Sequence, residues 1–181
     1  MRKLILKMEC TLDGYVGGPG GDVDWAFPDM NDAYVQWIVP RLASAGAHLM
    51  GANLYRDMAP HWPASKEAFA PPINEIPKVV FSSTLQLAEW GETRIVCGDV
   101  GTEVRRLLQQ AGKPLLAHGG ARFAQTLWRE GLVDECWWVM HPVMLGQGLR
   151  MFTAEIARQR FEVAEQAAFG NGLTAWVLKK A

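Results

Sequence analysis

The segment 114–133, PLLAHGGARFAQTLWREGLV, constrains the fold of this chain more than any other stretch. A short apolar run leads into two glycines, and an amphipathic pattern follows in which Phe123 and Leu127 share one helical face. Gly119 and Gly120 allow a sharp turn and a close approach to a ligand, because neither carries a Cβ. A helix that starts directly after such a turn has unpaired N–H groups, which suit a phosphate. Two interpretations are open: a phosphate-binding turn, or a tight turn alone.

Similar junctions precede this one. An apolar run ends at Gly51, where Asn53 is placed to cap a helix, and another run ends at Ser82. After about residue 133 the pattern becomes a continuous apolar run and then two alternating segments joined by Gly-Asn-Gly at 170–172. The order predicts a single α/β domain over residues 1–181: a three-layer sandwich with a mostly parallel central sheet, helices on both faces and a C-terminal antiparallel hairpin.

The strand ends predict a ligand site. In a parallel sheet, ligands bind beyond the carboxyl ends of the strands, and Gly51, Ser82 and the glycine pair all follow strands at that end. A nucleotide-like ligand is expected there. The glycine-rich loop 17–22 is either a lid over this ligand or a solvated hairpin tip. Five prolines in residues 58–77 predict an irregular segment with one short helix around 65–70, and Pro40 should kink or shorten the preceding helix.

Charge and cysteine content narrow the classes of partner. The formal net charge of −1 gives no electrostatic reason to expect nucleic acid or an anionic membrane. No apolar run approaches the length of a bilayer span, and the N-terminus lacks a signal-peptide core. Cys10, Cys97 and Cys136 are far apart and lack metal-ligand spacing. We therefore expect reduced, buried thiols, no metal site and a cytoplasmic location.

Several motifs together resemble the dihydrofolate reductase superfamily. The resemblance is closest to the branch that includes the C-terminal reductase domain of the riboflavin-biosynthesis deaminase/reductase. It rests on TLDGYVGGPGGDVDW (11–25), LMGANLY (49–55), VVFSST (79–84), LLAHGGARFAQTLWREGLVDE (115–135) and HPVMLGQGLRMF (141–152). The resemblance implies the family's fold and a reduced nicotinamide dinucleotide, usually the 2′-phosphorylated form.

The same resemblance implies the cofactor residues. The pyrophosphate would lie at the start of the helix after the glycine pair, a second phosphate junction would follow the strand ending at Gly51, and the nicotinamide would meet the first loop. The residues concerned are Gly119, Gly120, Ala121, Arg122 and Phe123, then Gly51, Ala52 and Asn53, then Ser82 and Ser83 at the adenosine end, and Val16 and Gly17 at the nicotinamide.

One departure affects the choice of cofactor. The family commonly has an arginine directly after the glycine that corresponds to Gly51, where it pairs with the 2′-phosphate, and this chain has Ala52. NADPH is expected and NADH remains possible, with the compensating cation to be found among Arg56, Lys78 and Arg122.

A second departure affects the chemistry. The family carboxylate follows a Trp-x-x-Pro segment, whereas here Trp25-Ala26-Phe27-Pro28 is followed at once by Asp29, one position early. Asp29 is the first candidate catalytic acid, with Asp24 or Asp32 as alternatives, and a helix N-cap is the competing role for Asp29. The candidate substrate-binding residues are Tyr15, Trp25, His61 and Trp62.

These observations support two hypotheses of function. The first is an NAD(P)H-dependent reductase that transfers a hydride to a small C=N or C=O substrate, such as a pterin-like or ribosylamino-pyrimidine compound. The alternative is a dinucleotide-binding protein of the same fold without turnover. The apolar Trp137-Trp138 strand and the Met144-Leu145 loop favour a homodimer, as does the family resemblance.

Overall fold

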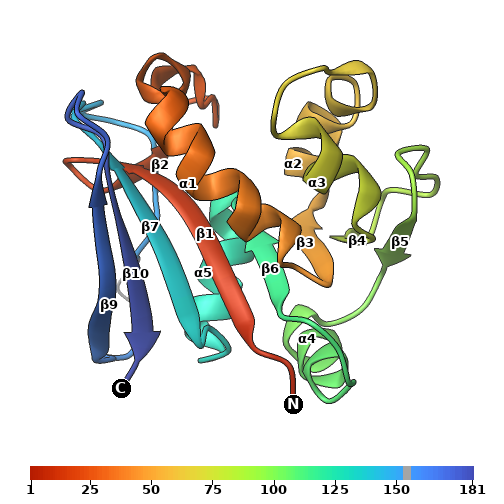
Figure 1. The fold of residues 1–181 in the computed structure, drawn as a ribbon. Coiled ribbons are helices and arrows are strands. Elements are labelled where there is room, and N and C mark those ends of the chain that lie inside the picture. Colours follow the sequence, from red (N-terminus) through yellow and green to blue (C-terminus); the bar gives the residue numbers. More distant parts are fainter. Residues whose placement is uncertain (153–155) are drawn as a thin grey trace.

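The computed structural model describes residues 1–152 and 156–181 and is built on an eight-stranded sheet in the order β5-β4-β3-β6-β1-β7-β10-β9 (Figure 1). Neighbouring strands are parallel from β5 to β7, and β10 runs antiparallel to both β7 and β9. A two-stranded sheet joins β2 (Tyr15–Gly17) to β8 (Leu149–Arg150). The strands of the main sheet are β1 (Leu4–Thr11), β3 (Ala47–Gly51), β4 (Lys78–Phe81), β5 (Thr93–Val96), β6 (Leu115–His118), β7 (Glu135–His141), β9 (Phe161–Ala168) and β10 (Thr174–Lys180).

Helices cover both faces of this sheet. The helices α1 (Asp32–Ala43), α2 (Ala52–Met58) and α3 (Ala70–Glu75) contribute buried residues to one hydrophobic cluster, and α4 (Val100–Leu108) and α5 (Ala121–Arg129) contribute to the other. In β1, Leu4 and Leu6 belong to the second of these clusters and Ile5 to the first, because successive strand side chains point to opposite faces. The predicted three-layer sandwich with its C-terminal hairpin at the edge is confirmed. Within the described ranges, no helix has the length and apolar content to cross a bilayer.

Two local predictions are wrong, and one of the two outcomes expected at Pro40 is excluded. Pro40 does not end α1, which continues to Ala43, because a proline this close to the end removes only one hydrogen bond of the last turn. The helix expected around 65–70 is absent; the segment instead forms a 3-10 turn, η2 (Trp62–Ala64), and α3, whose prolines lie in the first turn where no N–H is needed. Cys10 and Cys136 are buried, but Cys97 is exposed after β5.

Candidate functional site

The three predicted cofactor junctions lie along one edge of the sheet. Strands β4, β3 and β6 are parallel neighbours, and Gly51 at the end of β3 stands opposite Phe81 at the end of β4. Ser82 follows β4, and the glycine pair 119–120 follows β6. The carboxyl ends of these strands therefore bring the junctions together, as Figure 1 shows for the arrangement of the strands.

The turn between β6 and α5 favours glycine through its backbone at Gly120 and through close packing at Gly119. Gly120 has a φ of 90° and precedes α5 as its N-cap without a side-chain hydrogen bond. A Cβ on Gly119 would lie 3.1 Å from the sulfur of Met8. The first turn of α5, from Ala121 to Arg122, thus begins at the sheet edge with no side chain competing for its N–H groups.

Phe123 has a structural position. Its ring is buried and stacks on Phe81 with the ring centroids 5.0 Å apart. A Cβ on Gly51 would lie 3.4 Å from the Cβ of Phe123, so the end of β3 and the start of α5 pack closely. The ring of Phe123 therefore ties the junctions together from within the core, and only its backbone is available to a ligand.

The second junction differs from the prediction in its cap. The N-cap of α2 is Gly51, and Asn53 lies inside the helix, too far along to cap it. The Oδ1 atom of Asn53 accepts a hydrogen bond from Nη1 of Arg56 at 3.1 Å, and Nη2 of Arg56 is 3.3 Å from the hydroxyl of Thr84. Arg56 sits four residues after Ala52, on the same helical face, and helical side chains lean toward the N-terminus. Its guanidinium therefore lies beside the turn that follows Ser82 and Ser83.

Ser82 and Lys78 mark the two ends of β4. The hydroxyl of Ser82 accepts the N–H groups of Thr84 and Leu85, at 3.1 and 2.8 Å, and so closes the turn, while Ser83 is exposed. Lys78 is buried at the opposite end of the strand, where its Nζ donates to the carbonyls of Asn74 and Ile76. Burial there lowers the pKa of Lys78 to about 8. The prediction that Lys78 could pair with a cofactor phosphate is wrong.

The first loop is fastened to the loop after β7. Val16 and Gly17 belong to β2, which pairs with β8. Gly148 passes so close to the carbonyl of Gly17 that a Cβ would collide with it. The hydroxyl of Tyr15 donates to Gly146 O at 3.2 Å and accepts from Arg150 Nη2 at 3.0 Å. Tyr15 is therefore held by this second loop.

A polar cluster lies where β1 and β7 end. His141, the last residue of β7, is fully buried. Its Nε2 is 2.8 Å from Oε2 of Glu9, and its Nδ1 is 3.0 Å from Oδ2 of Asp29. The ring of Trp25 stands edge-on to the imidazole, with centroids 5.2 Å apart. The structure thus brings the predicted residues Asp29 and Trp25 together around a histidine that sequence reasoning did not select.

Glu9 is the anionic centre of this cluster. Its Oε1 accepts a hydrogen bond from the hydroxyl of Tyr34 at 2.7 Å and forms an ion pair with Lys7. Burial raises the pKa of Glu9, but Lys7 and the hydrogen bond from His141 outweigh burial and lower that pKa to about 2. The pKa of Tyr34 is raised well above its usual value by burial and by the adjacent Glu9 charge. Glu9 is therefore ionised and Tyr34 neutral at neutral pH.

Asp29 does not cap a helix. It is the last residue of the 3-10 turn η1 (Asp24–Asp29), and Asn31 is the N-cap of α1, with its Oδ1 accepting from Tyr34 N at 3.0 Å. The carbonyl of Asp29 accepts from Asn171 Nδ2 at 2.7 Å, which fixes its backbone to the β9–β10 turn. Asp24 is exposed and, within the described chain, has no hydrogen bond to the cluster.

Aromatic rings connect the other predicted substrate residues to this cluster. Trp62 packs near Phe69 with centroids 6.1 Å apart, and Phe69 in turn lies 6.5 Å from Tyr34. His61 stands edge-on to Trp62 and pairs with Glu67 at 2.8 Å, more than half exposed. Trp62 therefore belongs to the outer wall beside α1, and His61 lies farther out.

Four cluster residues were missed from the sequence: Lys7, Glu9, Tyr34 and His141. A signal for two of them was present, because Lys7 and Glu9 are charged residues at alternate positions of an otherwise apolar strand and so point to the same face. Two charged side chains on one face of a central strand need polar partners. The sequence does not show that these partners are Tyr34 and His141.

A second buried pair of histidines differs from the cluster. Nε2 of His118 is 2.8 Å from Nδ1 of His48, and Nε2 of His48 is 3.0 Å from the carbonyl of Pro72. The carbonyl can only accept, so each Nε2 carries the hydrogen and both rings are neutral. Burial lowers the pKa of His48 to about 4 and, with His48, that of His118 well below its usual value. Both rings of this pair are therefore uncharged at neutral pH.

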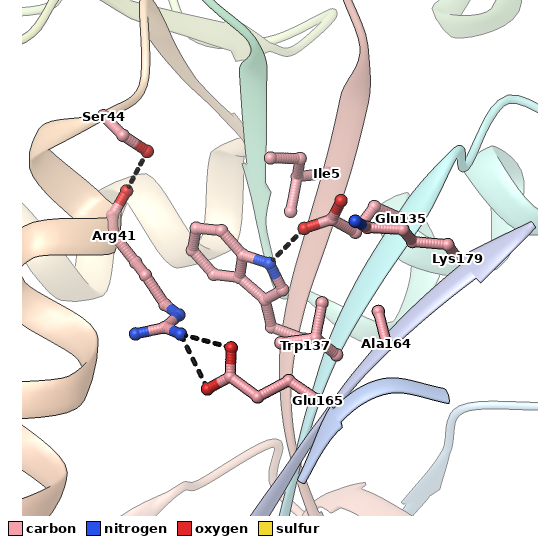
Figure 2. A pocket seen from close by; sticks show the side chains of 9 residues that line it. Ile5, Arg41, Ser44, Glu135, Trp137, Ala164, Glu165 and Lys179 are labelled. Atoms are coloured by element: carbon pink, nitrogen blue, oxygen red, sulfur yellow. Dashed lines mark hydrogen bonds and ion pairs between the residues drawn. The ribbon is translucent and has the colours of Figure 1, made fainter. Parts of the chain in front are cut away.

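A separate hollow of about 350 Å³ lies toward the other end of the sheet (Figure 2). It is lined in part by Ile5 and Glu135, near the start of β1 and β7, and by the end of α1. In its wall, Arg41 binds Glu165 through two contacts of 2.7 Å, and the indole of Trp137 donates to Glu135 at 2.8 Å. Lys179 also lines it and is exposed. None of the predicted cofactor or substrate residues lines this hollow.

The sheet order, the glycine pair 119–120 after β6 and the polar cluster at the ends of β1 and β7 define an α/β domain of the dihydrofolate reductase-like class. Dihydrofolate reductase from Enterococcus faecalis, solved with NADP(H), has this fold, with a TM-score of 0.67 and 11% identity over 98% of this chain and 96% of that one. The chain belongs to the RibD C-terminal domain family, whose model matches residues 2–175.

Relatives of this family span different lengths. The uncharacterized protein YyaP of Bacillus subtilis is 26% identical over 177 residues, 95% of this chain and 92% of that protein. A putative riboflavin biosynthesis protein from Shewanella sp. PV-4 has a TM-score of 0.73 at 19% identity, with 99% of both chains covered. The Thermotoga maritima deaminase/5-amino-6-(5-phosphoribosylamino)uracil reductase has a TM-score of 0.70 at 16% identity. There, 99% of this chain matches 57% of the bifunctional protein. The chain thus corresponds to a domain of the riboflavin-reductase and dihydrofolate-reductase type.

Proposed function

We propose that the protein is an NAD(P)H-dependent reductase that transfers a hydride to a C=N or C=O bond of a small substrate. The observation that carries this proposal is the adjacency of two features. The glycine pair 119–120 follows the end of β6. The polar cluster of Glu9, His141 and Asp29 lies at the ends of β1 and β7, the next two strands of the sheet. A dinucleotide bound at the glycine pair would bring its nicotinamide toward the polar cluster.

The residues present fit a dinucleotide. Gly119 leaves room that a Cβ would fill, and Gly120 adopts a φ that favours glycine, so the turn can approach a pyrophosphate closely. Backbone N–H groups of Ala121 and Arg122 would hold that group, with Gly51 at the second phosphate junction, Ser83 toward the adenosine, and Val16 and Gly17 toward the nicotinamide. When bound, a reduced nicotinamide supplies the hydride.

The chain's own residues orient the substrate and handle the proton. Trp25 offers an aromatic surface beside His141, Trp62 offers another through Phe69 next to Tyr34, and the carboxyl of Asp29, 22% exposed, is the accessible acid of the cluster. A pterin-like or ribosylamino-pyrimidine ring would suit these surfaces. The activities of two structural relatives, a 5-amino-6-(5-phosphoribosylamino)uracil reductase and a dihydrofolate reductase, support this choice.

The test is a binding titration followed by a turnover panel. Quenching of tryptophan fluorescence should report saturable binding of NADPH, and cofactor oxidation should follow with 5-amino-6-(5-phosphoribosylamino)uracil, dihydrofolate or a pterin aldehyde. Binding without oxidation across the panel would favour the alternative, a dinucleotide-binding protein. Absence of binding by both NADPH and NADH would overturn the proposal.

Arg56 should select NADPH over NADH. The family arginine is replaced by Ala52 in this chain, and Arg56, one helical turn later, supplies a cation in its place. The Arg56 side chain already reaches Thr84 in the turn after Ser82. A charge-assisted hydrogen bond to a phosphate contributes about 1.5–3 kcal/mol, so Arg56→Gln should weaken NADPH binding about tenfold or more and leave NADH binding unchanged. The matched control is Arg94→Gln, which removes an exposed arginine of β5 that pairs with Glu103. Equal weakening of both cofactors would contradict this role.

We also propose a cytoplasmic homodimer. Exposed hydrophobic side chains at Met144, Val163 and Trp176 support an interface, and three free cysteines suit a reducing compartment. Sedimentation at micromolar concentration should give a dimer, and Trp176→Glu should shift it toward monomer, whereas Lys179→Glu on the same strand should not. A strict monomer in the unmodified protein would refute the dimer.

A further inference from the structure

The hydrogen bonds of His141 require one proton more than a neutral histidine and two carboxylates possess. Glu9 is ionised, so its Oε2 can only accept, and Nε2 of His141 must carry a hydrogen. The other ring nitrogen, Nδ1, lies 3.0 Å from Oδ2 of Asp29. Without a further hydrogen, two lone pairs would face each other across this contact. One extra proton therefore lies between His141 and Asp29.

This proton belongs on the ring, because an imidazole is the stronger base of the two. We propose that His141 is an imidazolium clamped between Glu9 and Asp29, and that it is the proton store from which Asp29 protonates the substrate. The inference rests on the proposed function and extends it: His141 acts through Asp29 as a positioning and proton-holding residue, and Asp29 is the group that touches the substrate.

The surroundings of His141 support storage in place of direct donation. The imidazole is fully buried and both its nitrogens are occupied by Glu9 and Asp29, so it does not reach a ligand itself. The charged and titratable groups around it come from three elements: Glu9 and Lys7 from β1, Asp29 from η1, and Tyr34 from α1, which touches Glu9. Lys7 pairs with Glu9, so the carboxylates of Glu9 and Asp29 are balanced by two cations, Lys7 and the His141 imidazolium.

The step balances in atoms and charge. Reduction of a C=N or C=O bond forms a C–H bond with the hydride of a reduced nicotinamide and an N–H or O–H bond with a proton. As Nδ1–H of His141 breaks, its proton passes to the carboxylate of Asp29, and the carboxyl formed there gives a proton to the substrate nitrogen or oxygen. The substrate is reduced and the nicotinamide is oxidised. His141 is left neutral and Asp29 ionised, and one proton from solvent, taken up through Asp29, restores the imidazolium.

Ring ¹⁵N NMR of the histidines tests the stored proton without any substrate. At neutral pH, His141 should show two protonated nitrogens, whereas His48 and His118 should each show one. Asp29→Asn should convert His141 to the neutral ring with hydrogen on Nε2, because the amide N–H of asparagine can donate to Nδ1. Glu103→Gln, which changes a carboxylate on α4, should leave the spectrum of His141 unchanged. A neutral His141 in the unmodified protein overturns the inference, and so does an imidazolium that persists in Asp29→Asn.

Two further measurements separate this inference from the proposed function. NADPH binding by fluorescence should be equal in the unmodified protein, in Asp29→Asn and in His141→Gln. If NADPH does not bind while His141 is doubly protonated, the proposed function fails and the stored proton stands. If NADPH binds and His141 is neutral, the stored proton alone is overturned. With a substrate from the panel, His141→Gln should lower kcat and leave KM unchanged, because the relay serves the chemical step and not substrate binding; an unchanged kcat in His141→Gln overturns the relay.

Discussion

Replacing Glu9 with glutamine should lower the free energy of unfolding by about 3 kcal/mol at neutral pH. The substitution keeps the shape of the side chain but removes the charge that Lys7 and His141 share, in a site where the Glu9 side chain is only 14% exposed. Breaking a buried ion pair by neutralising one partner leaves the other charge uncompensated, which costs about 3–5 kcal/mol in other proteins. Urea unfolding of the two proteins at neutral pH measures the difference.

The same difference should depend on pH in a definite direction. The pKa of Glu9 is about 2 in the folded protein and near its usual value of 4.5 when unfolded. A group whose pKa is depressed by folding stabilises the protein above its unfolded pKa and loses that contribution as the pH falls toward the folded value. The gap between the unmodified protein and Glu9→Gln should therefore be full above about pH 5 and shrink steadily toward pH 2.

Glu103 provides a matched control for this prediction. Its pKa is also about 2, through hydrogen bonds and ion pairs with Arg106 and Arg94. Both arginines are about half exposed, so solvent screens these pairs and Glu103→Gln should cost only about 0–1 kcal/mol. Equal losses in the two variants would show that burial of the Glu9 cluster contributes nothing to its stability.

Replacing Gly120 with valine should weaken NADPH binding by about tenfold or more. A Cβ at this position has space, since the nearest atom, Cβ of Leu54, is 3.9 Å away, so the effect comes from the backbone. A β-branched residue at a φ of 90° is strained by about 1–3 kcal/mol, and relief of that strain rotates the turn and moves the first N–H groups of α5. A fluorescence titration with NADPH measures the loss.

The control for this substitution is Gly98→Val. Gly98 follows β5, lacks a left-handed φ and has no atom within 4 Å of an added Cβ. It should leave NADPH binding unchanged, and thermal unfolding of both variants shows that each remains folded. If Gly120→Val bound NADPH as tightly as the unmodified protein, the turn between β6 and α5 would not hold the pyrophosphate.

Most of the fold could be predicted because its signals are local. Alternating apolar runs and amphipathic segments, punctuated by Gly51 and Gly119-Gly120, indicate strands that feed helices, and Gly-Asn-Gly at 170–172 identifies the hairpin. Helix boundaries in the proline-rich segment were wrong, because prolines are tolerated in a first turn and the pattern does not show which residue begins it. The position of β10 between β7 and β9 depends on tertiary pairing.

The polar cluster was harder to predict because its members are far apart in the chain. Glu9 and His141 are separated by 132 positions and meet only because β1 and β7 are parallel neighbours in a fixed register. Asp29 was selected from its Trp-x-x-Pro context, but its orientation depends on Asn31 taking the cap of α1 and on Asn171 holding its carbonyl. A single sequence contains each of these residues without the distances that join them.

The fastening between the first loop and the loop after β7 has a consequence for how a ligand enters. Asp13 accepts the N–H groups of Leu145 and Gly146, at 3.3 and 2.7 Å, and the Gly17–Gly148 approach leaves no space for either segment to slide. The two loops are therefore expected to open together, although 132 positions separate Asp13 from Leu145. A substitution beyond residue 143 that breaks these contacts should therefore alter the first loop, and with it the entry of a ligand to the proposed site beside β1, without changing any residue of that loop.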